Sequence, residues 1–86
     1  MTKLEQKLIE LGYEKEITYV SSNVFSKYIV TLTMTYCISI ELDIQGKVET
    51  GYVDSNHYFK TQQEINDLQQ AFNEMQEDLE ELKKYE

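Results

Sequence analysis

The chain has 86 residues, and its 16 Asp and Glu residues outnumber its 8 Lys residues, which gives a formal net charge of −8. This length indicates a single domain, residues 1–86, with a thin hydrophobic core. Nucleic acids and anionic membranes are bound through clusters of Lys and Arg, so the charge argues against direct binding to either. A partner with a basic surface is favoured instead.

Cysteine usage and hydropathy point to a cytoplasmic protein without a membrane span. A single cysteine, Cys37, cannot form an internal disulfide, and no charged and apolar leader opens the chain. The longest candidate for a membrane span, residues 28–44, alternates polar and apolar side chains. We therefore expect a protein of the reducing cytoplasm.

The first predicted element is a helix over residues 2–11. Thr2 and Glu5 have the spacing of a capping box, in which the Thr side chain accepts a hydrogen bond from the backbone N–H of Glu5. Gly12 supplies the left-handed residue that ends such a helix, and Tyr13 follows it in a Schellman arrangement. The face of this helix that is expected to be buried carries Leu4, Leu8 and Leu11.

An antiparallel sheet is predicted over residues 16–53, where the hydrophobic period changes from 3.6 to two. Ile17 and Tyr19 are expected to begin it, and residues 21–23 are expected to form a turn. Beyond this turn one alternating set of side chains is assigned to the core: Tyr28, Val30, Leu32, Met34, Tyr36, Ile38, Ile40 and Leu42.

An alternating segment of this length requires a bend near residues 33–35. A straight strand would extend roughly 57 Å, which is more than a domain of this size accommodates. The core-assigned residues occupy even-numbered positions both before and after residues 33–35. We therefore expect a bulge or a loop with an odd number of residues, because an even loop would exchange the faces.

A second hairpin is predicted at residues 43–47, where Asp43 opens a type I turn and Gly46 takes the left-handed position. This turn implies a register in which Leu42 pairs with Val48. The same register pairs Ile40 with Thr50, and Ile38 with Tyr52. Gly51 in the last strand indicates a bulge or a close approach of another backbone.

The last element is a long amphipathic helix over residues 61–85, which opens with a second capping box at Thr61 and Glu64. Residues 61–86 carry eight acids and two lysines, whereas residues 1–60 carry eight acids and six lysines, so most of the net charge lies here. Apolar residues repeat with heptad spacing at Ile65, Leu68, Phe72, Met75, Leu79 and Leu82.

The order of these elements predicts an α+β fold. A helix, three or four antiparallel strands and a long helix fit a two-layer sandwich in which both helices cover the apolar face of the sheet. Within this fold the heptad seam has two interpretations. It packs on the sheet, or its distal part dimerises through Phe72, Met75, Leu79 and Leu82.

No catalytic, metal-binding or cofactor-binding motif is predicted. His57 is the only histidine and lies in a predicted loop, without the clustered ligands that a zinc site needs. Cys37 lies on the polar side of the sheet, without a neighbouring basic group to generate a thiolate. No nucleophile, base and orienting group can be assembled, so we do not expect an enzyme.

The acidic face of the last helix is the candidate binding site. Carboxylates on successive helical turns stand about 5 to 6 Å apart, close to the phosphate spacing of a nucleic-acid strand. The plain alternative is a solvated face that keeps the protein soluble. The carboxylates assigned to partner binding are Asp67, Glu74, Glu77, Asp78, Glu80 and Glu81.

Two segments resemble small open reading frames of phages and prophages of Gram-positive bacteria. They are the opening LEQKLIELGY of residues 4–13 and the sequence INDLQQAFNEMQ of residues 65–76. The resemblance covers both helices, about a third of the chain, and implies a context rather than functional residues. Small acidic phage proteins often block host machinery, and some anti-CRISPR proteins mimic DNA and share a helix, sheet, helix order.

These observations lead to two functional hypotheses. The first is a non-enzymatic protein-binding module of phage or mobile-element origin, which inhibits a basic nucleic-acid-binding host protein in the cytoplasm of an infected or lysogenic bacterium. The alternative is a structural or assembly protein that forms a homodimer through its C-terminal heptad helix.

Overall fold

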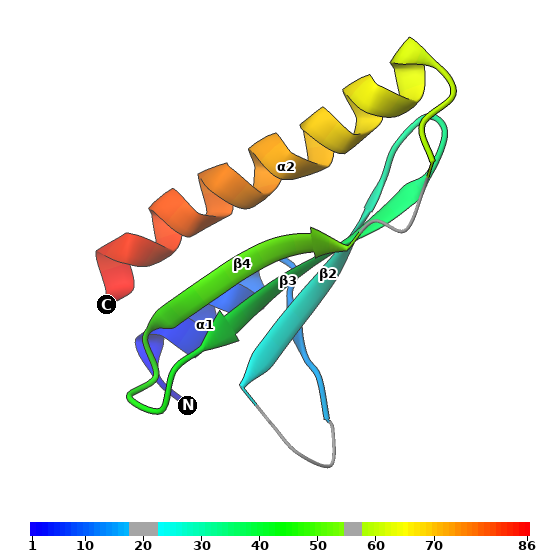
Figure 1. The fold of residues 1–86 in the computed structure, drawn as a ribbon. Helices are drawn as coiled ribbons and strands as arrows, with labels where there is room; N and C mark the ends of the chain where they lie inside the picture. Colours follow the sequence, from blue (N-terminus) through cyan, green and yellow to red (C-terminus); the bar gives the residue numbers. More distant parts are fainter. Residues whose placement is uncertain (18–22, 55–57) are drawn as a thin grey trace.

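The computed structural model describes residues 1–17, 23–54 and 58–86 (Figure 1). The described residues form two α-helices and four strands, and a short 3-10 helix follows the last α-helix. In chain order they are α1 (Lys3–Glu10), β1 (Glu14–Lys15), β2 (Val24–Val30), β3 (Thr35–Leu42), β4 (Val48–Asp54), α2 (Gln62–Leu82) and the 3-10 helix η1 (Lys83–Tyr85). The predicted α+β fold is confirmed.

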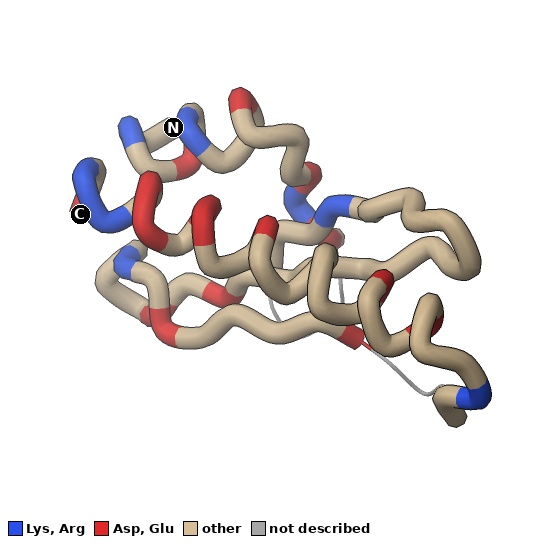
Figure 2. The backbone as a smooth tube through the Cα atoms, turned by 90° about the horizontal axis from the view of Figure 1, so that it is seen from above, with Lys and Arg blue, Asp and Glu red and all other residues tan. Residues whose placement is uncertain are grey.

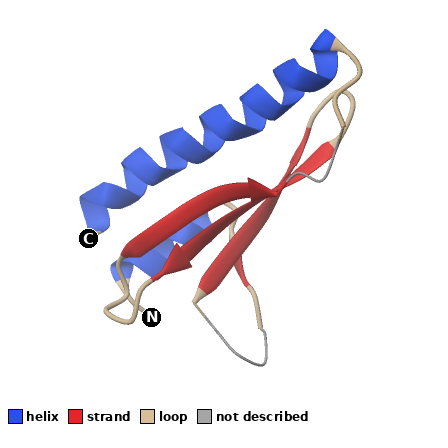
Figure 3. Cartoon of the chain, in the orientation of Figure 1, coloured by secondary structure: helices blue, strands red, loops and turns tan. Residues whose placement is uncertain are grey.

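The strands form one antiparallel sheet in the order β1-β2-β3-β4, so that neighbours in sequence are neighbours in the sheet. Helix α2 runs along the sheet as a separate layer (Figure 3), and α1 contacts α2 and η1. Both helices pack on the same face. Their buried residues share one core with β2 and β3: Leu4, Leu8, Phe25, Ile29, Tyr36, Ile38, Ile40, Leu42, Ala71, Met75 and Leu82.

Helix α1 begins and ends as its sequence predicts. The backbone N–H of Glu5 donates to Thr2 Oγ1 at 3.1 Å, which caps the first turn. After the helix, Gly12 takes a φ of +99°, and Tyr13 N donates to Leu8 O at 3.0 Å. This hydrogen bond is the long-range bond of a Schellman motif, and it turns the chain towards the sheet.

The prediction for the start of the sheet is wrong. Strand β1 is Glu14–Lys15 and pairs with Phe25 and Ser26, whereas Ile17 lies after it and is almost fully exposed. The reason is the Schellman turn, which delivers the chain to β2 directly after Tyr13. Tyr19 and the predicted turn residues 21 and 22 lie outside the described residues.

The turn between β2 and β3 contains an even number of residues, contrary to the prediction. Val30 pairs with Thr35, and residues 31–34 form a four-residue turn in which Thr31 N donates to Met34 O at 2.8 Å. An even loop exchanges the two faces. The core side of β2 is therefore the one that carries Phe25 and Ile29. Tyr28 and Val30 lie on the outer face, 73% and 77% exposed.

The hairpin between β3 and β4 has the predicted turn but not the full predicted register. Asp43 Oδ1 accepts hydrogen bonds from the N–H groups of residues 45 and 47, Gly46 has a φ of +81°, and Leu42 pairs with Val48. Glu49 is then an extra residue in a bulge, so the pairing beyond it moves by one residue. Ile40 pairs with Gly51, and Ile38 pairs with Val53.

Gly51 marks a close approach, but of a side chain and not of the predicted backbone, because a Cβ atom there would lie 3.2 Å from the Leu79 side chain. Helix α2 therefore packs tightly on β4 near its C-terminal end. Its buried face is rotated from the predicted seam: Ala71 and Met75 are buried, while Ile65 and Phe72 are nearly half exposed. The predicted heptad seam therefore lies along one side of the area where α2 contacts the sheet, and not at the centre of that area.

Candidate functional site

The six carboxylates assigned to partner binding lie at three depths. Asp67 and Asp78 are buried, with 2% and 7% of their surface exposed. Glu74 and Glu81 are half-buried and form ion pairs with lysines. Only the remaining two, at positions 77 and 80, are exposed. A buried carboxylate cannot contact a partner in this conformation, so the exposed acidic surface is smaller than the sequence suggests.

Asp78 belongs to a network centred on Lys27, a core-facing residue of β2. Lys27 Nζ lies 2.6 Å from Asp78 Oδ2 and 3.0 Å from Glu74 Oε2, and it donates to the carbonyl of Leu11 at 3.0 Å. The lysine side chain is only 11% exposed. Because a buried charge is costly unless it is paired and hydrogen-bonded, these contacts are what make Lys27 tolerable in the core.

Tyr13 completes this network from the turn after α1. Its hydroxyl donates to Asp78 Oδ2 at 2.8 Å, and Lys27 Nζ lies 4.7 Å from the centre of its ring. Burial raises the pKa of Tyr13, and the hydrogen bond to the Asp78 carboxylate raises it further. The phenol therefore stays protonated and holds the end of α1, strand β2 and helix α2 together.

Asp67 anchors the other half of α2 to the turn between β2 and β3. Asp67 Oδ2 accepts hydrogen bonds from the Thr33 hydroxyl and, at 2.8 Å, from the Thr33 N–H. Asp67 Oδ1 accepts from Gln63 Nε2 at 2.8 Å. The Thr33 hydroxyl is the main reason that the pKa of Asp67 is lowered, against the opposing effect of desolvation. This carboxylate acts as a structural anchor in its charged form.

Glu81 joins the C-terminal end of α2 to α1. Its carboxylate lies 3.7 Å from Lys7 Nζ and 3.0 Å from Lys84 Nζ. The hydrogen bond from Lys84 is the main cause of its lowered pKa. Figure 2 shows acidic positions following one another along α2, with lysines near the two chain termini at one end of the domain.

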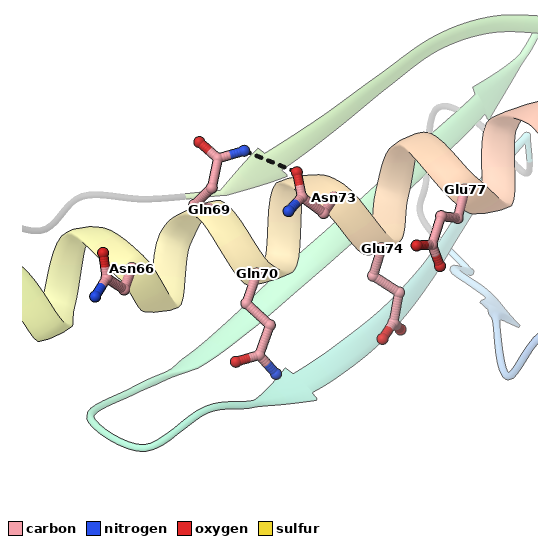
Figure 4. A pocket seen from close by; sticks show the side chains of 6 residues that line it. All are labelled: Asn66, Gln69, Gln70, Asn73, Glu74 and Glu77. Atoms are coloured by element: carbon pink, nitrogen blue, oxygen red, sulfur yellow. Dashed lines mark hydrogen bonds between the residues drawn. The ribbon is translucent and has the colours of Figure 1, made fainter.

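The outer face of α2 is polar and accessible. Figure 4 shows six side chains projecting from it around a shallow, open depression: Asn66, Gln69, Gln70, Asn73, Glu74 and Glu77. Gln69 Nε2 donates to Asn73 Oδ1 at 2.8 Å along the helix. Glu77 and Glu80 make no ion pair with another described residue, so this face presents unneutralised carboxylates next to amide groups.

The residues assigned to the dimer seam are also divided by the structure. Met75 and Leu82 are buried in the core and contribute to packing on the sheet. Phe72 is 42% exposed, and Leu79 is half-buried. Only Phe72 and part of Leu79 therefore remain accessible to a second molecule.

The other candidates offer no assembled chemistry. Cys37 is half-buried on the outer face of the sheet, with Sγ 3.9 Å from Ser39 Oγ, and His57 lies outside the described residues. Within residues 1–17, 23–54 and 58–86, no three His, Cys, Asp or Glu side chains are grouped to hold a metal ion. None of the described helices has the length and apolar character needed to cross a membrane.

No protein-family model, curated protein or solved structure matches this chain.

The burial of two aspartates is the feature that the sequence interpretation missed. Asp67, Ala71 and Asp78 follow one another at spacings of four and seven residues, which places them on one helical face. A small residue between two acids on one face is compatible with a helix pressed against a sheet. That spacing was the available signal, but the partners Lys27 and Thr33 could not be assigned to it without the fold.

Loss of the hydroxyl should change the free energy of unfolding differently at the two buried tyrosines, Tyr13 and Tyr36. Tyr13→Phe removes a hydrogen bond to a carboxylate, so the free energy of unfolding should fall by about 2 kcal/mol. Tyr36→Phe is the matched control, because Tyr36 Oη is buried without a hydrogen-bond partner among the described residues. Its stability should be unchanged or higher by up to about 1 kcal/mol. Urea unfolding of both variants measures the contrast, and equal losses would contradict this account.

Asp67 should make the stability of the fold depend on pH in the acidic range. Because its folded-state pKa is lowered, its contribution is fully present above the unfolded pKa of about 3.9. The contribution is lost as pH falls through the lower folded value. Asp67→Asn should therefore be less stable at pH 7 and lose less of its remaining stability on acidification than the parent protein.

Urea unfolding at several pH values from neutral to about pH 3, which is below the unfolded pKa, measures how the free energy of unfolding changes on acidification. Glu77→Gln is the control, since Glu77 is exposed and lies on the same helix. Its pH dependence should follow that of the parent. A parallel pH dependence of Asp67→Asn and the parent would show that Asp67 is not the titrating anchor.

Proposed function

We propose that this protein is a non-enzymatic binding module whose exposed carboxylates on α2 engage a basic, nucleic-acid-binding protein of a bacterial host. The observation that carries the proposal is the pair Glu77 and Glu80, exposed and without a lysine partner in the described part of the chain. Glu74 extends this pair along the helix, although Lys27 neutralises it in part.

Mutual repulsion gives this surface its preference for a cation. Glu74, Glu77 and Glu80 follow one another at spacings of three residues, which makes neighbouring carboxylates adjacent on the helix surface. Like charges at this spacing destabilise each other by a few tenths of a kcal/mol. A basic partner relieves that repulsion and is steered towards the surface by the net charge of −8.

The shape of the site favours binding over catalysis. Glu77 and the amide side chains Gln70 and Asn73 project from the outer face of α2 (Figure 4). The depression on this face is shallow and open, so a substrate would not be enclosed by a second wall. The face can instead enter a basic groove, with carboxylates in place of phosphates and amides as hydrogen-bonding groups. This mode fits a small phage-encoded inhibitor of the DNA-mimic type.

The alternative function, an assembly protein that dimerises through α2, is favoured by the exposure of Phe72. An aromatic side chain that is 42% exposed in the middle of a helix is a typical contact residue in protein interfaces.

Capture of host proteins from a bacterial lysate at low and high salt tests the proposed partner surface. The double variant Glu77→Lys/Glu80→Lys should lose a basic, DNA-binding protein that the parent captures at low salt, and the parent should lose it at high salt. Glu74 and Glu81 are left intact because their ion pairs support the fold.

The matched control is Glu14→Lys/Glu49→Lys, which changes the net charge equally at two exposed sheet positions. It should retain most of the capture. Equal loss in both double variants would reduce the effect to net charge, and capture that persists at high salt would contradict an electrostatic partner surface.

A further inference from the structure

Strand β4 forms an edge of the sheet whose free backbone groups can be assigned. Leu42 N donates to the carbonyl of Asn23, so the backbone groups of Leu42 point from β3 towards β2. Because these directions alternate along an antiparallel strand, the backbone of Ser39 points towards β4. Its partner in β4 is Tyr52, whose backbone points back.

The residues on either side of Tyr52 therefore direct their N–H and C=O groups away from the sheet. These are Gly51 and Val53, and no strand in the described part of the chain pairs with this edge. Only the start of the edge is protected: Val48 N donates to Glu86 Oε1 at 2.9 Å, and Glu49 forms a bulge. Natural sheets usually block free edges with charge, proline or bulges, but residues 51–53 carry none of these.

The side of α2 next to this edge is mostly uncharged, although exposed Glu80 borders it in a depression shared with Gln76 and Lys83. We call it the Phe72 flank and define it as Ile65, Leu68, Gln69, Phe72, Gln76, Leu79 and Lys83. Leu79 and Lys83 line a groove together with Glu49 and Gly51 of β4 and with Glu86, which places this flank on the β4 side of the helix. Glu74 and Glu81 occupy the opposite flank, where they face Lys27 and Lys7.

We propose that the β4 edge and the Phe72 flank together bind the same surface of a second copy of this chain in an antiparallel arrangement. The surface is self-complementary. Phe72 is the midpoint of α2, and Ile65 and Leu79 lie seven residues before and after it. When two such helices lie antiparallel, Phe72 meets its counterpart and Ile65 of each copy meets Leu79 of the other.

The strand edge also has a two-fold arrangement, centred on Tyr52, whose neighbour Gly51 lies against Met75 and Leu79 of α2. Antiparallel pairing of two β4 strands about Tyr52 places Gly51 opposite Val53, which brings the outward-pointing backbone groups of both copies together. Thr50 then lies opposite Asp54, and Tyr52 lies opposite its counterpart on the outer face, so no like charges are opposed. An axis perpendicular to the sheet at this edge also makes the two α2 helices antiparallel neighbours.

The register of the strand edge favours a second copy as the occupant, because pairing about Tyr52 opposes Gly51 with Val53 and brings no like charges together along residues 50–54. The repulsion between two molecules with a net charge of −8 each limits the affinity of this contact. A standard interface buries about 800 Å² per partner. That is about an eighth of the 6043 Å² surface of this domain, which one side of the molecule can supply.

Sedimentation velocity at tens to hundreds of micromolar tests the dimer, a range that corresponds to a modest affinity. The parent should sediment as a dimer whose population is maintained or increased by salt, because salt screens the repulsion between the copies. Phe72→Glu should be a monomer. The matched control Tyr28→Glu, on the exposed outer face of the sheet, should remain a dimer.

Gln76→Glu is a second variant at an exposed helical position, where folding is undisturbed, and it should weaken the dimer as well. Circular dichroism confirms that each variant is folded. A parent that stays monomeric throughout this range, or a dimer that persists in Phe72→Glu, would overturn the proposal. The partner surface at Glu77 and Glu80 does not depend on it, because lysate capture by the monomeric variant is measured separately.

Amide hydrogen exchange locates the strand contact. In the concentrated parent the amides of Gly51 and Val53 should be protected, and in Phe72→Glu they should exchange at least tenfold faster, which corresponds to about 1.4 kcal/mol of lost protection. A dimer in which these two amides exchange as fast as in the monomer would overturn the strand part of the proposal and leave a contact through the helices alone.

Discussion

Lys27 is the side chain on which three parts of the fold converge. It comes from the core face of β2, reaches the carbonyl that ends α1, and pairs with Asp78 and Glu74 of α2. The ring of Tyr13 is a fourth group near its ammonium. The lysine is stable in a thin core because each of these contacts offsets part of the cost of removing its charge from water. The same contacts fix the rotation of α2 about its own axis. That rotation decides which of its carboxylates remain on the surface.

The rotation of α2 determines how many of its carboxylates are exposed to solvent. The helix carries most of the net charge in its sequence, but Asp67 and Asp78 serve as anchors, and Glu74 and Glu81 are paired with lysines. A count of acidic residues therefore overstates the surface that is available to a partner. The carboxylates that remain exposed are Glu77 and Glu80, and Glu77 lies beside the amide side chains of the outer face.

The two sides of α2 suggest different kinds of contact. The outer face is charged, so a contact through it is weakened by salt, whereas the Phe72 flank is nearly uncharged, so a contact through it is maintained when salt screens the repulsion between copies. The free edge of β4 lies beside this flank, and Gly51 brings Leu79 close to the strand. The two surfaces adjoin along α2, because Glu80 lines one depression with Gln76, Leu79 and Lys83 of the Phe72 flank.

The sequence by itself determined the features that depend on neighbouring residues. The capped start of α1, its glycine end, the turn opened by Asp43 and the capped start of α2 are all local hydrogen-bonding patterns, and the structure confirms each of them. Tertiary structure alone decided the face of β2, the bulge at Glu49 and the burial of Asp67 and Asp78. One residue more or less in a loop changes which face of the adjoining strand points into the core. A carboxylate is buried only where a partner that is distant in the sequence contacts it. Both outcomes are settled by pairing in the folded chain, and local periodicity by itself does not give the loop length or the partners Lys27 and Thr33.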